Sequence, residues 1–153
     1  MKPGDTVEDF ELLDETGAPR TLSGLLADGP VVLFFYPAAM TSGCTAESCH
    51  FRDLSAEFAA LGARPVGISP DAVSKQQAFS TANGGFGFPL LSDPDGTVAK
   101  LFGTRRPIGP LRTRRRTFVI DTDRTVLAAI KSEFRMEIHA DQALEALRAR
   151  QPG

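Results

Sequence analysis

The chain has 153 residues, of which 42% are hydrophobic and 24% are charged, and its formal net charge is −2. This composition is ordinary for one soluble globular domain with a substantial core. A small negative charge gives the whole protein no attraction to nucleic acid or to an anionic membrane. We therefore expect a single domain over residues 1–153, and a basic function only where positive charge is local.

Two features of the sequence bear on location. The first residues, Met1 to Asp5, lack the apolar region of a secretory signal. The longest unbroken apolar run, Val31 to Tyr36, is far too short to span a bilayer. We therefore expect a cytoplasmic protein with no membrane partner. Two cysteines close together in such a protein suggest redox or metal chemistry rather than a structural disulfide.

Strand-like and helix-like stretches alternate along the first two thirds of the chain, and a hairpin follows. In order, the patterns predict strands at 10–13 and 31–36, a helix at 41–61, a strand at 65–69, a helix including 73–79, a short strand at 89–92, a short helix at 97–102, a loop at 103–111, a hairpin of 117–120 and 126–130, and a helix over about 139–150. This order predicts an α/β layered domain with a mixed sheet.

Both cysteines follow the apolar strand closely. Cys44 lies at a turn rich in Pro, Thr, Ser and Gly, where the predicted helix begins, and Cys49 comes five residues later. The amide groups and the macrodipole at a helix N-terminus favour a thiolate over a thiol. The sequence therefore predicts that Cys44 is a reactive nucleophile with a second cysteine in reach.

The spacing of the two cysteines limits how they can pair. On a regular α-helix, residues five apart have Cα atoms roughly 8–9 Å from each other. A disulfide needs a Cα separation of about 4.4–6.8 Å. Cys44 and Cys49 can therefore bond only if the helix unwinds locally, which suits a switch between two redox states better than a permanent crosslink.

Two other interpretations of the cysteines stay open at this point. Both could be small, inert side chains in the core, because free cysteine is often buried. Cys44, Cys49 and the adjacent His50 could also bind a metal, with His139 as the only other histidine. Structural zinc sites usually have four ligands in short CxxC-type spacings, which this chain lacks.

The residues around Cys44 resemble a known family. Pro37, Thr41 and Cys44 match the Pro-x-x-x-Thr-x-x-Cys signature of peroxiredoxins, and residues 43–53 resemble the branch called bacterioferritin comigratory protein or peroxiredoxin Q. Further similar stretches cover nearly the whole chain: 4–5, Phe10, 68–71, 88–93 and 117–121. The resemblance implies a thioredoxin-like fold, with a central mixed sheet flanked by helices and an N-terminal strand extension.

The resemblance also implies an activity. In that branch, the cysteine at the position of Cys44 is the peroxidatic one and a resolving cysteine follows five residues later, here Cys49. The chain would reduce hydrogen peroxide and organic hydroperoxides through a Cys44 sulfenic acid and a Cys44–Cys49 disulfide. Thioredoxin or a similar dithiol protein would restore both thiols. No bound cofactor or metal is implied, and a resolver in the same chain suggests a monomer.

A positive charge must stabilise the Cys44 thiolate, and a guanidinium is suited to this because it stays charged and has several donors. Family members carry this arginine two residues before a Thr/Ser-Phe pair, which here makes it Arg115, before Thr117-Phe118. Along a strand Arg114 and Arg116 would point away from Arg115. All three could instead be solvated charges, the usual fate of such a run.

Three more residues are implied in the site. The Thr41 hydroxyl could donate to a peroxide oxygen, although capping the helix is its ordinary role. Pro37 would shield the sulfur from water, or would only end the strand. Glu47, three residues after Cys44, would lie on the same side of the helix and orient the arginine. Left unpaired, its charge would hinder ionisation of the cysteine.

Two departures from the family and one rival function remain. The residues between Pro37 and Thr41 are apolar, so we expect bulky organic hydroperoxides to be accepted well.

Six arginines lie within the segment from Arg105 to Arg116. They could form a solvated loop, or a docking patch for an acidic partner or nucleic acid. With that patch, the same cysteine switch could serve a redox sensor that binds a partner. A disulfide reductase is disfavoured because no CxxC is present.

Overall fold

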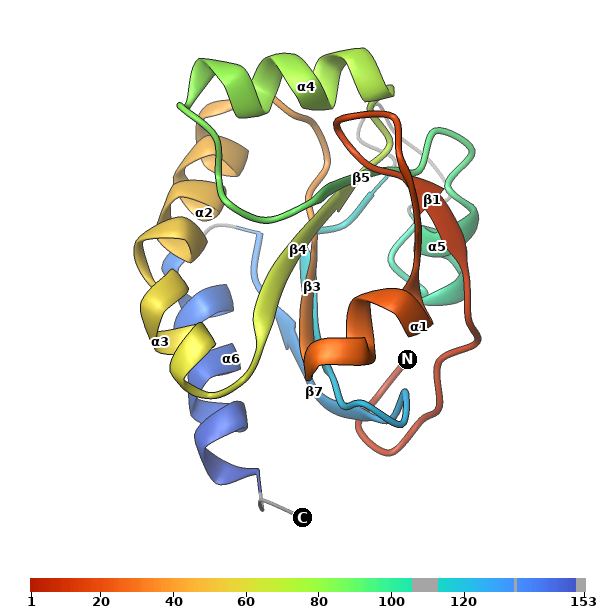
Figure 1. Cartoon of the computed structure of the whole chain (residues 1–153), viewed down its shortest axis with the longest axis vertical. Helices are drawn as coiled ribbons and strands as arrows, with labels where there is room; N and C mark the ends of the chain where they lie inside the picture. The colour runs from red at the N-terminus through yellow and green to blue at the C-terminus, as the bar shows by residue number, and fades with distance from the viewer. Residues whose placement is uncertain (106–112, 134, 151–153) are drawn as a thin grey trace.

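The computed structural model describes residues 1–105, 113–133 and 135–150 (Figure 1). Its elements, in chain order, are β1 (Glu11–Leu13), β2 (Pro19–Thr21), α1 (Leu22–Leu25), a 3₁₀ turn η1 (Leu26–Asp28), β3 (Val31–Phe35), α2 (Ser42–Asp53), α3 (Ser55–Ala60), β4 (Arg64–Ser69), α4 (Val73–Ala82), β5 (Leu90–Ser92), α5 (Thr97–Leu101), β6 (Arg116–Ile120), β7 (Val126–Lys131) and α6 (Glu137–Ala149). Within this part of the chain no helix has the length and apolar character that a membrane span requires.

The strands form one mixed sheet of seven strands in the order β2-β1-β5-β4-β3-β6-β7. The central strands β5, β4 and β3 run parallel, and β6 and β7 add antiparallel strands on one side. On the other side β1 pairs antiparallel with β5, and β2 with β1. The predicted mixed sheet and its N-terminal strand extension are thus confirmed.

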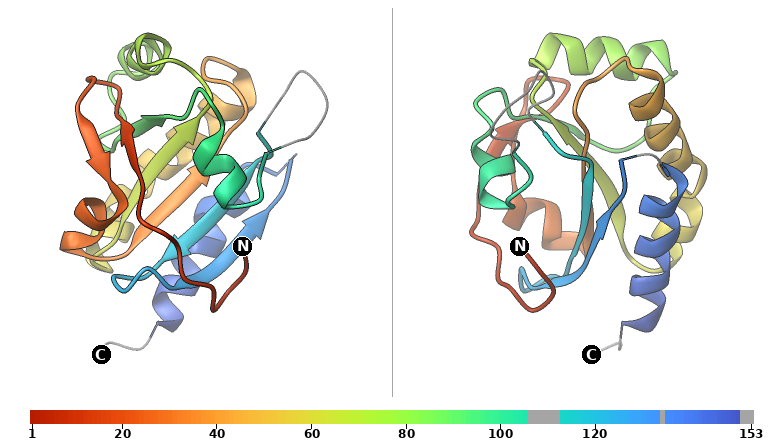
Figure 2. Two further views of the ribbon diagram at one scale, coloured as in Figure 1. Left: turned by 90° about the vertical axis from the view of Figure 1, so that its right-hand side faces the viewer. Right: turned by 180° about the vertical axis from the view of Figure 1, so that it is seen from behind.

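Helices cover both faces of the sheet (Figures 1 and 2). All five residues of β3 are buried, which agrees with the unbroken apolar run at 31–36. Successive side chains of a strand point to opposite faces. Val32 and Phe34 accordingly join a core cluster with α2, α3, α4 and α6, while Leu33 and Phe35 join a second cluster with α1 and α5.

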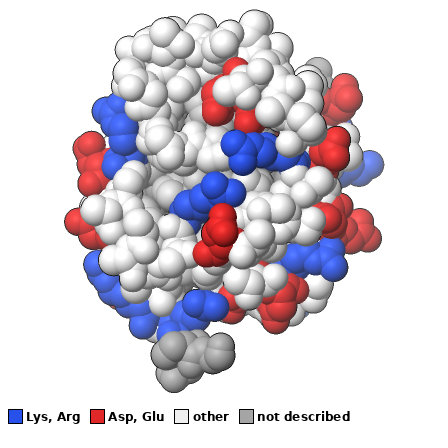
Figure 3. Space-filling model, viewed as in Figure 1, with Lys and Arg blue, Asp and Glu red and all other residues white. Residues whose placement is uncertain are grey.

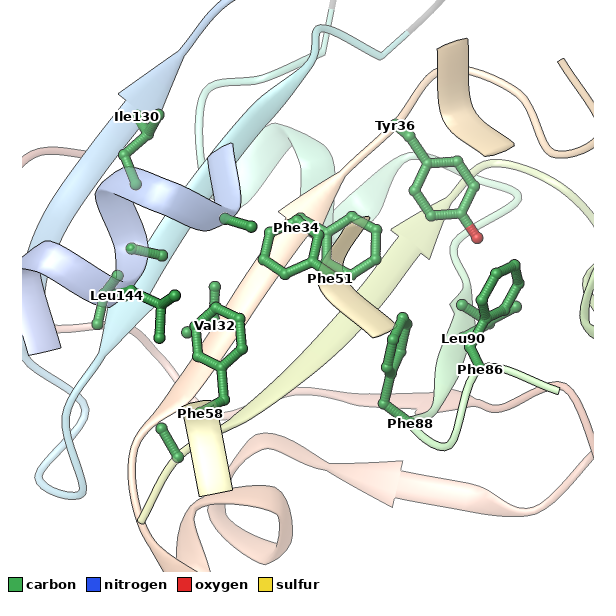
Figure 4. Close-up of a cluster of buried hydrophobic side chains, with 14 of the residues drawn as sticks. Val32, Phe34, Tyr36, Phe51, Phe58, Phe86, Phe88, Leu90, Ile130 and Leu144 are labelled. Atoms are coloured by element: carbon green, nitrogen blue, oxygen red, sulfur yellow. The ribbon is translucent and has the colours of Figure 1, made fainter. Parts of the chain in front are cut away.

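Aromatic stacking holds α2 against β3. The rings of Phe34 and Phe51 lie 4.2 Å apart between centroids and are nearly parallel, with 14° between their planes (Figure 4). Both side chains are fully buried, and burial of one such side chain contributes roughly 1.5–3 kcal/mol. This contact fixes the C-terminal half of α2 on the sheet, and thereby the helix that carries both cysteines.

The predicted single helix at 41–61 is wrong in one respect, because α2 and α3 are separate helices that meet at Leu54. The hydroxyl of Ser55 donates to the carbonyl oxygen of Phe51 at 3.5 Å, the oxygen that a helical amide at Ser55 would use. Serine side chains that compete in this way often bend helices. Gly62, with a φ of 73°, follows α3, and its left-handed conformation ends the helical segment one residue after the predicted boundary at 61.

Other boundaries shift by a residue or two. β3 ends at Phe35 rather than Tyr36, and α6 begins at Glu137 rather than near His139. The strand β2 and the short helix α1 were not predicted. The predicted loop at 103–111 lies mostly outside the described residues.

The turn between β1 and β2 is built around a buried carboxylate. Asp14 is 1% exposed and accepts hydrogen bonds from the Thr16 amide, the Thr16 hydroxyl, the Ala18 amide and Arg20 Nε, at 2.8, 2.6, 3.1 and 2.9 Å. Burial alone would raise the pKa of Asp14, but these donors together lower it below its ordinary value.

We predict that Asp14→Ala lowers the free energy of unfolding by about 2 kcal/mol near neutral pH, because buried donors lose a charged acceptor. A lowered pKa in the folded state means that this stabilisation is present above the pKa of the unfolded aspartate and is lost as pH falls through the folded one. Urea unfolding at several pH values should therefore show the two proteins converging in acid. A constant difference at every pH would contradict the prediction.

Candidate active site

The loop that leads into α2 is tied to the end of the neighbouring strand β4. The amide of Ala39 donates to Asp71 Oδ2 at 2.6 Å, and the hydroxyl of Ser69 donates to the same oxygen at 2.7 Å. Asp71 is a site residue that we did not predict as such. Its position directly after β4, one strand away from β3, was the available signal.

Met40 occupies an unusual conformation in this loop. Its φ is 70°, in the left-handed region that residues other than glycine rarely adopt, and its side chain is 51% exposed. Such conformations cost of order 1–3 kcal/mol and cluster at functional sites. The loop is therefore held in place by its contacts rather than by its own preference.

Cys44 lies in the first turn of α2 and is fully buried. Arg115 Nη2 donates to its sulfur at 3.2 Å. A guanidinium and a helix N-terminus both favour negative charge on a sulfur. The structure thus gives Cys44 the surroundings of a reactive thiolate rather than of an inert core residue.

The register of the sheet explains how Arg115 reaches the cysteine. β3 and β6 pair antiparallel with Phe35 opposite Arg116, so Arg115 lies where β3 leads into the loop before α2. Arg115 is 5% exposed, whereas Arg116 is less buried and forms an ion pair with Glu133 at 3.1 Å. Arg115 is therefore not a solvated charge.

Glu47 anchors the arginine from one turn further along α2. Arg115 Nη1 donates to Glu47 Oε1 at 2.7 Å, and Glu47 is fully buried. Burial raises the pKa of Glu47 to about 8, and the charge of Arg115 opposes this shift. One guanidinium therefore contacts two groups, the carboxyl of Glu47 and the sulfur of Cys44. Protonation of Glu47 leaves more of that positive charge to the sulfur.

His139 and Thr117 lie behind Glu47. His139 Nε2 contacts the carbonyl oxygen of Ser132 at 2.9 Å, and Nδ1 contacts the Thr117 hydroxyl at 2.8 Å. A carbonyl can only accept, so Nε2 carries the hydrogen and Nδ1 accepts from Thr117. Burial lowers the pKa of His139 to about 4, and the neutral ring adds no positive charge near Glu47 Oε2, 3.7 Å from Nδ1. We had considered His139 only as a metal ligand.

The remaining predicted residues lie around this centre. Cys49 is half-buried on α2, and both cysteines are free. Thr41 occupies the N-cap position, but its hydroxyl donates to the Ala38 carbonyl oxygen at 2.8 Å and caps nothing. Pro37 is half-buried, just past the end of β3. The structure thus brings Cys44, Glu47 and Arg115 into contact, and the roles of Thr41 and Pro37 stay predictions.

The metal interpretation finds no support in the described residues, where no group of three His, Cys, Asp or Glu side chains could hold an ion. His50 instead contacts Asp141 at 2.9 Å. The basic segment can be followed only in part, because residues 106–112 lie outside the described residues. On the face shown in Figure 3, charges of both signs are mixed, and the region over α4 is largely uncharged.

Comparison with known proteins agrees with this geometry. The family model described as AhpC/TSA matches residues 3–129. The chain belongs to the AhpC/TSA family, the peroxiredoxins. It is 62% identical to a Mycobacterium tuberculosis protein named as a peroxiredoxin, over 100% of both chains. It is 36% identical to the chloroplastic peroxiredoxin Q of Sedum lineare, over 95% of this chain and 77% of the relative.

Solved structures of peroxiredoxins share the whole fold. The crystal structure of peroxidoxin BcpB from M. tuberculosis matches with a TM-score of 0.94 and 60% identity, over 99% of each chain. The bacterioferritin comigratory protein of Xanthomonas campestris matches with a TM-score of 0.84 and 32% identity, over 97% of this chain and 96% of that one. The thioredoxin-like fold and the resemblance to this branch of peroxiredoxins are thereby confirmed.

Two substitutions at Glu47 separate its charge from its hydrogen bond. Glu47→Gln keeps an oxygen that can accept from Arg115, whereas Glu47→Ala leaves Arg115 without its anchor. At about pH 7 we expect the second-order rate constant for peroxide to stay within about threefold of wild type in Glu47→Gln and to fall about tenfold in Glu47→Ala.

The pH dependence gives a second measure of the same pair. Because the pKa of Glu47 is raised to about 8, the wild-type carboxyl becomes negative above that pH and competes with the thiolate for Arg115. Stopped-flow rates should therefore show the ratio of Glu47→Gln to wild type rising between about pH 7 and pH 9. A ratio that falls over this range would show that the negative charge itself assists the reaction.

Proposed function

We propose that the chain is a thiol peroxidase in which Cys44 reduces peroxides, Cys49 resolves the oxidised Cys44, and thioredoxin or a similar dithiol protein regenerates both thiols. The observation that carries this proposal is the contact of Arg115 Nη2 with the buried Cys44 sulfur at 3.2 Å, in the first turn of α2. An arginine, a helix N-terminus and a cysteine converge there on one sulfur.

The first step is a displacement at oxygen. The Cys44 thiolate attacks the terminal oxygen of the peroxide, the O–O bond breaks, and the products are a Cys44 sulfenic acid and, after uptake of a proton, water or an alcohol. Arg115 favours the negative sulfur before attack. The Thr41 hydroxyl is exposed at the N-cap of α2, and it would donate to a peroxide oxygen once it leaves the Ala38 carbonyl.

The second step joins the two cysteines. Both lie on the continuous helix α2, so α2 must unwind locally before the sulfurs can meet. Attack of Cys49 on the sulfenic acid releases water and forms an intramolecular disulfide. An external dithiol then reduces it by thiol–disulfide exchange. A resolver in the same chain lets a cytoplasmic monomer complete the cycle, and no bound cofactor takes part.

The residues around the site support the proposal that it accepts more than one class of peroxide substrate. Met40 is 51% exposed and Ala38 is half-buried in the loop before α2, and together they provide apolar surface for an organic substituent. The bacterioferritin comigratory protein of Xanthomonas campestris has alkyl peroxide reduction activity. We propose that this chain reduces both hydrogen peroxide and organic hydroperoxides.

The first test is a single oxidation. Reduced protein mixed with an equimolar amount of hydrogen peroxide should lose both thiols rapidly and lose the mass of two hydrogen atoms as a monomer, because an activated Cys44 and an internal resolver act in sequence. Rapid thiol titration and intact mass spectrometry measure this. Thiols that survive as long as free cysteine would contradict the proposal.

Substitution of each cysteine separates the two steps. Cys44→Ser should abolish peroxide consumption, because no sulfenic acid can form. Cys49→Ser should consume one equivalent of peroxide and then lose recycling by thioredoxin, which a coupled assay with thioredoxin reductase follows. Full turnover of Cys49→Ser would refute the resolver assignment. A wild-type protein that oxidises once, changes its affinity for a partner and is not recycled would instead be a redox sensor.

A further inference from the structure

We propose that Arg52 is a positioning residue for Cys49, which holds the sulfur of the resolving cysteine and stabilises its negative charge when it attacks oxidised Cys44. The inference rests on the proposed function, since it assigns a partner to the resolver. Each cysteine would then have its own arginine, Arg115 for Cys44 and Arg52 for Cys49.

The contact itself is direct. Arg52 Nη2 donates to the Cys49 sulfur at 3.6 Å, from one turn further along α2. The thiol hydrogen of Cys49 points to a different neighbour, because its sulfur lies 3.9 Å from Asn83 Oδ1, an acceptor. The sulfur therefore has an acceptor for its hydrogen in the thiol state and a cationic donor for its charge in the thiolate state.

The guanidinium is fixed by other contacts across the helix boundary. Arg52 Nη1 donates to the carbonyl oxygens of Asn83 and Gly85 at 2.5 and 3.4 Å, where α4 ends. Its central carbon lies 5.6 Å from the centroid of the Phe86 ring, whose side chain is buried in the core cluster of Figure 4. Carbonyls at a helix C-terminus and an aromatic face both attract a cation.

This anchoring leaves the positive charge of Arg52 available. Within the described part of the chain, its contacts are with carbonyl oxygens, a ring and a sulfur, and none is with a carboxylate. An arginine that only tied α2 to α4 would not need to face a sulfur. The geometry instead places an uncompensated guanidinium next to the cysteine that must become a nucleophile.

The anchoring also indicates which end of α2 moves. Thr41 makes no capping bond at the N-terminus of α2, and the first turn has no acidic residue. The other end is tied to α4 by Arg52. Oxidation of Cys44 removes the thiolate that Arg115 contacts in the reduced protein. Unwinding should then start at the Cys44 end, while Cys49 and Arg52, one turn apart, stay together.

The chemistry balances without a further reagent. Cys49 gives up its thiol proton, and its sulfur attacks the sulfur of the Cys44 sulfenic acid. The S–O bond breaks, the leaving hydroxide combines with that proton, and the products are a disulfide and water. Arg52 acts on the charged form of Cys49, so it should matter to this step and not to the reaction of Cys44 with peroxide.

The test compares Arg52→Met and Arg52→Lys with wild type in single turnovers. Sulfenic acid formation and disulfide formation are followed separately by rapid quenching with a thiol-blocking reagent and intact mass. In Arg52→Met we expect the first step to be unchanged and the second to slow by about tenfold near pH 7. Arg52→Lys should recover part of the loss because it retains the charge. Arg148→Met, on the exposed side of α6, is the matched control and should not slow either step.

The pH profile distinguishes charge stabilisation from a structural effect. Hydroxide becomes available to take the Cys49 proton as pH rises, so the deficit of Arg52→Met should shrink between about pH 6 and pH 9 if Arg52 acts by stabilising developing negative charge. Provided that wild type forms the Cys44–Cys49 disulfide, two results would overturn the inference. One is that Arg52→Met shows no deficit in disulfide formation. The other is a deficit that is equal at every pH and is not reduced in Arg52→Lys. If wild type itself forms no such disulfide, the proposed function fails instead.

Discussion

The site depends on one buried guanidinium that is shared between a sulfur and a carboxyl group. Arg115 contacts Cys44 and Glu47 with its two terminal nitrogens, and all three side chains are excluded from water. Buried charges are tolerated only when they have partners. The pairing therefore requires β6 and β3 to keep their register, because a slip of one residue would turn Arg115 to the other face of the sheet. It also requires Glu47 one turn after Cys44.

The two ends of α2 differ in how firmly they are held. The C-terminal half is stacked through Phe51 on Phe34 and tied to α4. The N-terminal end has an uncapped first turn and follows Met40 in a left-handed conformation. Between the cysteines, the buried hydroxyl of Ser48 has no hydrogen-bond partner among the described residues, which costs about 1–3 kcal/mol. These features lower the free energy needed to unwind α2 from the Cys44 end once Cys44 is oxidised and no longer holds Arg115 as a thiolate.

Local patterns in the sequence predicted most of the fold and which residues meet at the centre of the candidate site, while contacts between distant segments could not be predicted. The apolar run of β3 and the motif around Cys44 singled out Cys44 as the candidate nucleophile, and strand alternation together with the family resemblance selected Arg115, which contacts it, among three arginines. His139 lies 92 positions after Glu47, and their proximity depends on how α6 packs on the sheet. The contact of Arg52 with Asn83 depends in the same way on where α2 and α4 meet.

Because Cys44 is buried, unwinding of α2 has two effects in the proposed cycle: it lets the two sulfurs meet, and it exposes the disulfide to the reductant. A dithiol protein cannot reach Cys44 in the folded helix, since the Cys44 sulfur is fully buried and Cys49 is only partly exposed. The same unwinding that brings the two sulfurs within disulfide distance must also carry the disulfide to the surface. In this cycle, refolding of α2 after reduction restores the contact between Cys44 and Arg115. The folded or unwound state of α2 is thereby coupled to the redox state of the cysteines.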